Sequence, residues 1–451
     1  MELPQTQAKT QMNLKRSNSS GPRVLLTGTN PWPVVPRLVL ALCAASCDVG
    51  VVYPNQNYPE REVEEVGDVF DYNGRSPLKS LQTAIDSFDP DIVVPTCDRS
   101  VEHLHELHAI SQSQGERGRK TATLIERSLG SPEGFPIVSS RFDLLKIAQS
   151  EGILVPRTAS MTSAAEFRQW STESTAPWVI KADGTWGGQG VRIVRNMDEA
   201  QRSVEEFTQG IGFLNLAKTL LLNRNRDWVL SEWRQSRPPV VAQSFINGRP
   251  ANCAVVCWQG NVLASVAVEV VTARSATGPA TLVQLVPGRE MIAAASKIAC
   301  RLGISGFFGL DFMIEEGTGA VYLIEMNPRC TPPCALPLGG GHNLVAAFYS
   351  QLTGRALSSD QPVIEQNVIS YASQSEGGVE KSSLDSTRAA EERIRKLLYP
   401  MSRRSVIGRL LDFVRPIPRQ EDKPVSFQAE SLPAPANKNA AAGIAVSMVT
   451  R

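Results

Sequence analysis

The segment 320–329 carries three polar side chains whose spacing could hold a metal ion and a phosphate group. It reads AVYLIEMNPR, and a short strand here places Glu325, Asn327 and Arg329 on one face, because alternate side chains of a strand point to the same side. Carboxylate and amide oxygens suit Mg²⁺, and an arginine offers a planar fork to a phosphate or a carboxylate. The segment therefore predicts a metal and phosphate site. The alternative is a surface hairpin with solvated charges.

A second carboxylate lies close by in the sequence. Asp311 belongs to GLDFMI at 309–314, which reads as a strand, and the EEGTG that follows at 315–319 is typical of a hairpin loop. Such a hairpin brings Asp311 alongside Glu325. We therefore predict that Asp311, Glu325 and Asn327 together bind the metal ion.

A glycine-rich loop offers a second phosphate contact. The segment DGTWGGQG at 183–190 holds four glycines between two expected strands, and Lys181 precedes it. Glycine permits close backbone approach, so successive N–H groups could point at phosphate oxygens, while the lysine adds a positive charge. A flexible turn is the alternative. The sequence contains no GxxxxGK[ST] motif, which excludes an ordinary P-loop.

Length and composition limit the class of protein. A chain of 451 residues favours two or three domains, and 46 Lys and Arg against 45 Asp and Glu give no electrostatic case for a nucleic-acid partner. The polar residues 1–20 read as a disordered tail, and no apolar stretch approaches the roughly 20 residues that span a bilayer. Eight cysteines in so long a chain indicate reduced thiols and a cytoplasmic location.

The elements that position these residues fall into two units. From residue 23 to 95, strands alternate with helices, which predicts a parallel sheet covered by helices. Asp98 follows the last of these strands and is either a ligand contact or a helix N-cap. A second unit begins near residue 140 with a helix at 141–151, and three antiparallel strands at 240–246, 253–258 and 262–271 precede a helix at 289–302.

The signal weakens in the C-terminal region. Segment 367–371 reads as one more strand, and 393–419 holds eight Lys and Arg interleaved with apolar residues. Such a stretch either contacts an anionic membrane surface or forms a solvated helix that packs on the body. The last thirty residues, rich in Ala, Pro and Ser, are expected to be disordered.

The order of these motifs resembles the ATP-grasp superfamily, in particular its carbamoyl-phosphate-synthase-like and carboxylate ligase branches, from about residue 23 to 354. The resemblance rests on IEMNPR, the upstream acid, the glycine loop and QSFINGR. It implies an α/β and α+β fold, in which a pre-ATP-grasp parallel-sheet domain at 21–140 precedes a two-subdomain ATP-grasp fold at 141–355. The smaller lid subdomain is expected at about 156–246, and 356–451 is a partly helical extension.

The resemblance also implies a role for each matching position. It assigns metal binding to Asp311, Glu325 and Asn327, and catalysis to Arg329 and Lys181, with Arg329 steadying the transferred phosphoryl group. It implies that the nucleotide is bound by a wider set, namely Arg141, Lys181, Gly187, Gly188, Gly190, Gln243 and Phe245. Gln243 departs from the family pattern, in which a glutamate is usual, and so does the RPAN segment at 249–252.

The implied activity is an ADP-forming ligase that uses ATP and Mg²⁺, with Mn²⁺ as a substitute. A small-molecule carboxylate is activated as an acyl phosphate and captured by an amine or, less often, a thiol. Glu269, His342 and the loop 275–281 lie where relatives contact the acceptor. Phosphorylation of bicarbonate or carbamate, and a non-catalytic nucleotide-binding module, are the two alternatives. A homo-oligomer is a further expectation.

Overall fold

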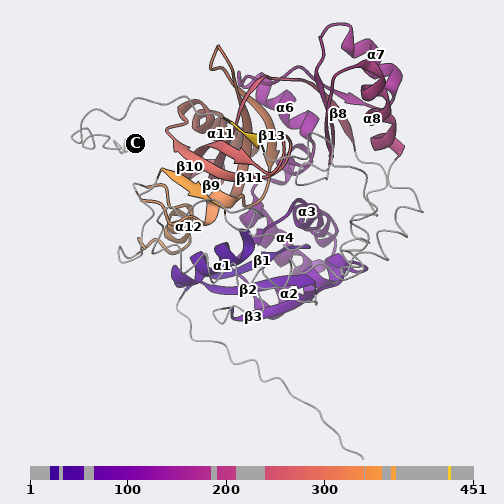
Figure 1. Ribbon diagram of the computed structural model, residues 1–451. Helices are drawn as coiled ribbons and strands as arrows, with labels where there is room; N and C mark the ends of the chain where they lie inside the picture. The colour runs from indigo at the N-terminus through magenta and orange to yellow at the C-terminus, as the bar shows by residue number, and fades with distance from the viewer. Residues whose placement is uncertain are drawn as a thin grey trace, which may run out of the picture.

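The described part of the chain forms three β-sheets in the computed structural model (Figure 1). The structure describes residues 21–29, 34–54, 66–183, 190–209, 239–339, 341–357, 367–371 and 425–427. The expected tail at 1–20 and the basic stretch at 393–419 lie outside these ranges. The mixture of one parallel and two antiparallel sheets confirms the expected fold class.

The N-terminal sheet is parallel, as the alternating pattern predicted. Its strand order is β3-β2-β1-β4, with β1 at Arg23–Thr27, β2 at Asp48–Pro54, β3 at Asp68–Tyr72 and β4 at Ile92–Pro95. The two central strands and β4 are almost fully buried, which suits a sheet covered on both faces. The α-helices described in this part are α1 (Val34–Ala44), α2 (Pro77–Phe88), α3 (Asp98–Ser111), α4 (Gly115–Leu129) and the short α5 (Phe135–Val138).

A small antiparallel sheet follows in the chain. Its order is β5-β8-β6-β7, from β5 at Thr158–Met161, β6 at Trp178–Ala182, β7 at Val191–Val194 and β8 at Val240–Ser244. Two helices, α7 (Ala164–Ser171) and α8 (Met197–Gln209), pack on one face of this sheet. The apolar core between them includes Phe167 of α7 and Trp178 of β6. The opposite face of this sheet lines the site described below.

The large sheet is antiparallel and carries the predicted hairpin. Its order is β13-β12-β9-β10-β11-β14, with β9 at Gly248–Trp258, β10 at Asn261–Ala273, β11 at Ala280–Val286, β12 at Gly306–Glu315, β13 at Val321–Asn327 and β14 at Val368–Ser370. Helix α11 (Arg289–Leu302) packs on one face, and α12 (Leu344–Thr353) packs against β9 and β10. Helix α6 (Arg141–Ser150) begins at the predicted residue and contacts β13.

Two strands of the large sheet differ from expectation. The sequence left 280–286 without a strand, whereas β11 pairs there with β10. The disorder expected for the last thirty residues is wrong at 425–427, because β15 (Val425–Ser426) also pairs with β10. Two residues are too short to show a period, and backbone hydrogen bonds to β10 determine their conformation.

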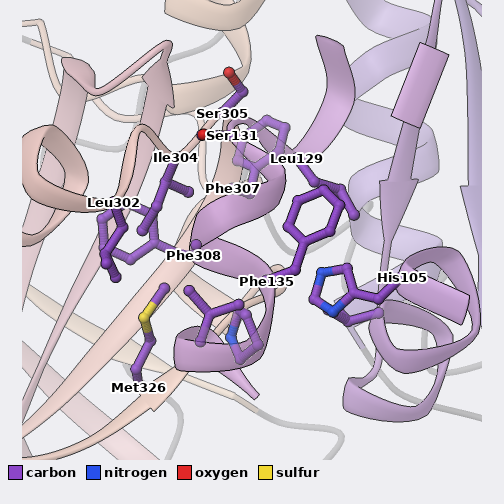
Figure 2. Close-up of a pocket in the computed structure, with 14 residues that line it drawn as sticks. His105, Leu129, Ser131, Phe135, Leu302, Ile304, Ser305, Phe307, Phe308 and Met326 are labelled. Carbon is purple, nitrogen blue, oxygen red and sulfur yellow. The ribbon is translucent and has the colours of Figure 1, made fainter. Parts of the chain in front are cut away.

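The N-terminal part and the large sheet meet at an apolar joint (Figure 2). Phe135 and His105 come from one side, and Phe307, Phe308 and Met326 come from the other. They enclose a cavity of only about 20 Å³, room for about one water molecule. His103 and His108 of α3 are buried in the N-terminal part.

All eight cysteines are free thiols, as predicted. Six of them are buried, and burial raises the pKa of Cys47 to about 12, with a smaller contribution from Cys43. Within the described ranges, no helix is long and apolar enough to cross a membrane.

Candidate functional site

One cavity gathers the predicted polar residues between the small sheet and the β12–β13 hairpin. Its volume is about 480 Å³, within the range of ordinary ligand pockets. Eight of the predicted residues line it: Arg141, Lys181, Gln243, Phe245, Asp311, Glu325, Asn327 and Arg329. The carbonyl of Gly190 accepts a hydrogen bond from Ala182, beside the loop, while Gly187 and Gly188 lie outside the described residues.

Asp311 and Glu325 stand directly opposite each other on β12 and β13, the pairing that the hairpin predicted. The Asp311 carboxylate accepts hydrogen bonds from Asn327 at 2.9 Å and from Asn252 on β9 at 2.6 Å. Burial raises the pKa of Asp311, and the neighbouring Glu325 carboxylate raises it further. Two neighbouring carboxylates repel each other, so the pair favours a cation between them.

Arg141 links the large sheet to the small one. Its guanidinium donates to Glu325 at 2.5 Å and also forms an ion pair with Asp183, just beyond β6. Ser140 caps the helix that begins at Arg141, since its hydroxyl accepts from the Asp143 backbone N–H. Burial acts to raise the pKa of Glu325, but Arg141 and then Lys181 outweigh it and lower that pKa. Glu325 is therefore held ionised.

Lys181 and Gln243 share one face of the small sheet. Val179 of β6 lies directly opposite Gln243 of β8. Lys181 lies two residues after Val179 on β6, so its side chain points to the same face as that of Gln243. Both side chains donate to the carbonyl of Ile324 on β13, Lys181 at 3.2 Å and Gln243 at 3.4 Å. Burial lowers the pKa of Lys181 to about 8, an effect that Arg141 reinforces and Glu325 opposes.

Arg329 connects the site to the N-terminal part. Its guanidinium donates to Asp98 at 2.9 Å and to the side-chain oxygen of Asn327 at 3.0 Å. Asp98 begins α3, just after β4, which is where the sequence placed a ligand contact or a cap. Cys97 is the N-cap of this helix, so the cap interpretation of Asp98 is wrong, and the Asp98 carboxylate accepts from Arg329 instead. Burial lowers the pKa of Arg329, but Asp98 outweighs it, so the pKa is raised and the guanidinium stays charged.

The family comparison agrees with this geometry. Residues 138–333 match the family model of the ATP-grasp domain. The chain contains an ATP-grasp domain. This match begins just before α6 and ends after β13, so it spans the small sheet and the hairpin and confirms the resemblance seen in the sequence.

Curated relatives of this ATP-grasp chain are ligases and synthases. The carbamoyl phosphate synthase large chain of Thermotoga sp. (strain RQ2) is 24% identical over 347 residues, which cover 66% of this chain and 30% of the relative. The phosphoribosylamine–glycine ligase of Nostoc sp. (strain PCC 7120 / SAG 25.82 / UTEX 2576) is 31% identical over 80 residues, which cover 18% of this chain and 19% of that one. The chain thus spans about 30% of the length of the carbamoyl phosphate synthase chains.

Solved structures share the fold. The biotin carboxylase of Campylobacter jejuni, in its βγ-ATP complex, matches with a TM-score of 0.53 and 15% identity, covering 76% of this chain and 73% of that one. The biotin carboxylase domain of Hydrogenobacter thermophilus 2-oxoglutarate carboxylase, solved with MgADP, ADP and bicarbonate, matches with a TM-score of 0.52 and 16% identity, covering 75% and 71%. These likenesses show the ATP-grasp fold and no more.

The candidate site has the donor atoms that a magnesium ion needs. Asp311, Glu325 and Asn327 supply oxygen, and the Asn252 side-chain oxygen is buried with no hydrogen-bond partner among the residues described. In the described ranges, no three acidic, His or Cys side chains converge as a metal-binding group. The residues therefore fit Mg²⁺ bound jointly with phosphate oxygens.

Three acceptor-contact predictions have different outcomes in the geometry. The loop predicted at 275–281 does line the cavity, through residues 276–280. Glu269 instead accepts from Arg249 at 3.2 Å, and His342 contacts the Ser265 carbonyl at 2.9 Å; neither is among the lining residues. Asp183 and Asn252 are the polar residues that sequence reasoning missed as individual contacts. Each belongs to a motif that the sequence had singled out.

Proposed function

We propose that this protein is an ADP-forming ligase that uses ATP and Mg²⁺ to activate a carboxylate as an acyl phosphate. An amine, or less often a thiol, then captures the acyl group. One observation carries the proposal: the cations Arg141, Lys181 and Arg329 and the carboxylates Asp311 and Glu325 line the same cavity. The ligand that needs both charges at once is a metal-bound polyphosphate.

The charged and polar residues would have separate roles in phosphoryl transfer. Arg141 and Lys181 would hold the phosphates of ATP, and Arg329 would stabilise the negative charge that spreads over the transferred group. Asp311, Glu325 and Asn327 would hold Mg²⁺, which neutralises charge on the terminal phosphates when bound. Gln243 and Phe245 lie on the small-sheet side and would face the nucleoside.

The reaction proceeds in two balanced steps. A carboxylate oxygen of the acid attacks the γ-phosphorus of ATP, the bond from that phosphorus to the bridging oxygen breaks, and ADP leaves. The amine nitrogen then attacks the acyl carbon, the carbon–oxygen bond to phosphate breaks, and inorganic phosphate leaves with loss of the amine proton. Neither step requires a nucleophilic side chain of the protein.

Phosphorylation of bicarbonate or carbamate is the second candidate function. The 24% identity to carbamoyl phosphate synthase large chains favours it. A non-catalytic nucleotide-binding module is less well supported, because the carboxylates and cations are all present in one cavity. Loss of the metal ligands is what would mark such a module.

The deciding experiment measures ADP formation from Mg·ATP across a panel of organic acids and amines, with bicarbonate plus ammonia as a parallel series. We expect turnover that requires both an organic acid and an amine. Turnover with bicarbonate alone would favour the second candidate. Millimolar Mg·ATP should also raise the melting temperature, because saturating ligand at about 100 times Kd stabilises the native state by about 2.7 kcal/mol. A chain that shows neither effect contradicts all three functions.

Further parts of the proposal concern organisation. The three sheets support a pre-ATP-grasp domain at 21–140 and an ATP-grasp domain at 141–355 with a lid at about 156–246. The free thiols support a cytoplasmic location. Self-association and membrane contact through 393–419 stay predictions.

A further inference from the structure

The floor of the cavity changes from charged to apolar across the large sheet. Four residues stand opposite one another on successive strands: Glu325 on β13, Asp311 on β12, Asn252 on β9 and Val268 on β10. Directly opposite residues share a face, and neighbouring strands lie about 4.8 Å apart, so Val268 is about 14 Å from Glu325. The row therefore passes from two carboxylates through an amide to a hydrocarbon.

The hydrocarbon end of the cavity, which we call the acceptor end, is built from four segments of the chain. Val268 and Val270 lie on β10, Val283 on β11, Tyr371 just after β14, and Val425 and Phe427 in and just after β15. None of these side chains carries a charge at neutral pH. The acceptor end therefore suits a neutral, apolar group.

The one acidic residue of β10 in this region points away from the acceptor end. Glu269 lies between Val268 and Val270, and alternation directs its side chain to the opposite face, where it pairs with Arg249. The charged residues that line the cavity are Arg141, Lys181, Asp311, Glu325 and Arg329, and we call them, with Asn327, the polar cluster. Among the described residues that line the acceptor end, no side chain of opposite charge would pair with a charged substrate body.

A second apolar region lines the cavity on the far side of the polar cluster. It comprises Val179 and Ile193 of the small sheet, Phe245 after β8, and Met313 and Ile324 of the hairpin. A nucleotide needs an apolar surface for its base beside the cations that hold its phosphates, and this region provides it. The acceptor end, on the opposite side of the carboxylates, is left for the second substrate.

The β15 segment closes part of the acceptor end. Val425 pairs with Ala273 of β10, and the backbone N–H of Phe427 donates to the Val271 carbonyl at 2.8 Å. Val425 and Phe427 line the cavity, whereas Ser426 between them is exposed. This alternation is that of a strand whose inner face contacts ligand.

We propose that the acceptor end binds a carboxylic acid with an uncharged, apolar body, and that Phe427 is a specificity-determining residue of its wall. The proposal rests on the ligase function above and names its substrate class. The carboxylate lies toward the polar cluster, and the aliphatic or aromatic body lies against Val268, Val270 and Phe427. Bicarbonate has no group to fill this region.

A matched acid series tests the substrate class. ADP formation is measured with straight-chain monocarboxylates, aryl-substituted propionates, and dicarboxylates of the same length, each with a common amine. We expect kcat/KM for the apolar acids to exceed that of the dicarboxylates by about tenfold or more, because a charged end group would be buried without a partner. Equal or better turnover with the dicarboxylates would overturn the proposal.

A variant series tests Phe427. Phe427→Ala should raise KM for an apolar acid about tenfold and leave KM for ATP unchanged, while Phe427→Leu should restore most of the loss. Leu154→Ala is the control, because Leu154 is 52% exposed and outside the cavity lining. Unchanged KM for the acid in Phe427→Ala contradicts the assignment. Faster turnover of every acid would also contradict it, since β15 would then be an obstructing segment.

The outcomes separate this inference from the function beneath it. Mg·ATP binding followed by turnover of only small or charged acids would leave the ligase function intact and remove the apolar substrate class. The absence of ADP formation with every acid and amine would remove the ligase function itself. Melting temperatures with Mg·ATP, measured on the same variants, show whether the nucleotide site has survived.

Discussion

The polar cluster of the cavity and the apolar joint of Figure 2 both connect distant parts of the chain, but they do so with opposite chemistry. In the cluster, Arg329 forms a mostly buried ion pair with Asp98, which lies 231 residues earlier in the sequence. In the joint, Phe135 of the N-terminal part and Phe307 and Phe308 of the large sheet line the same small cavity. Buried ion pairs contribute little net stability compared with apolar packing, so a group of buried charges beside a cavity is a candidate for a role in function. The comparison predicts that changes in the cluster alter function and that changes in the joint alter stability.

The largest effect is expected for Glu325→Gln. The amide keeps the shape of the side chain but removes a metal ligand and the partner of Arg141. Turnover should fall at least about 1000-fold, equivalent to about 4 kcal/mol of transition-state stabilisation. Steady-state ADP formation measures it, and Glu290→Gln on the exposed side of α11 is the matched control. Activity within a few-fold of the parent would refute the metal assignment.

The next largest effect is expected in the apolar joint, where a substitution should reduce stability and not ATP binding. Phe135 is 7% exposed, stacks on His105 and lines the small cavity together with Phe307 and Phe308, so Phe135→Ala enlarges the cavity between the two parts. We expect a loss of about 3 kcal/mol in the free energy of unfolding, measured by urea denaturation, with KM for ATP unchanged. Ile110→Ala is the control, because Ile110 is 42% exposed on α3 and should change stability by less than about 0.5 kcal/mol. An equal loss in both variants would mean that the joint is not a packed core.

The comparison also shows what sequence reasoning could reach. The IEMNPR hairpin was predictable because its elements are local: a strand alternates, a short turn reverses it, and Asp311 must meet Glu325. Strongly periodic elements were equally accessible, and α11 begins and ends at the predicted residues. Family resemblance then supplied roles that periodicity does not contain.

Contacts between distant segments were not accessible in the same way. Nothing local indicates that Asp98 meets Arg329, or that Asp183 shares Arg141 with Glu325, because those pairings depend on how whole sheets dock. The β15 strand shows the same limit on a small scale. Its two residues carry no period of their own, and they form a strand only because β10 offers backbone partners.

A third prediction separates function from stability at one residue. Lys181 is a buried cation, and burial lowers its pKa to about 8. Lys181→Met removes the charge that would hold the phosphates, so kcat/KM for ATP should fall about 100-fold. The melting temperature should stay the same or rise, because an apolar side chain of similar length avoids the cost of burying an ammonium group. A fall in melting temperature together with unchanged kcat/KM would show that Lys181 contributes to stability and not to function.

The smallest predicted effect is a pH dependence of stability that comes from the joint. Burial, and then the nearby His108, lowers the pKa of His105 from 6.5 to about 4. The groups around it are few: the Ser139 hydroxyl lies at 3.2 Å, the Phe135 ring stacks on it, and His108 pairs with Glu126 at 2.8 Å. Between about pH 6.5 and pH 4, the His105 imidazole therefore stays neutral in the folded protein, whereas in the unfolded chain it takes up a proton.

The sign of the effect follows from that difference. The contribution of His105 is complete above about pH 6.5 and is lost as the pH falls from 6.5 toward 4. Because the side chain is only partly shielded from solvent, we expect about 1–2 kcal/mol over this window. Urea denaturation of the parent and of His105→Gln, each at pH 7.5 and pH 5, measures it, and the difference between the two proteins should shrink or reverse at the lower pH. A difference that does not change with pH would show that His105 is already solvated, and the joint would then be more open than its packing indicates.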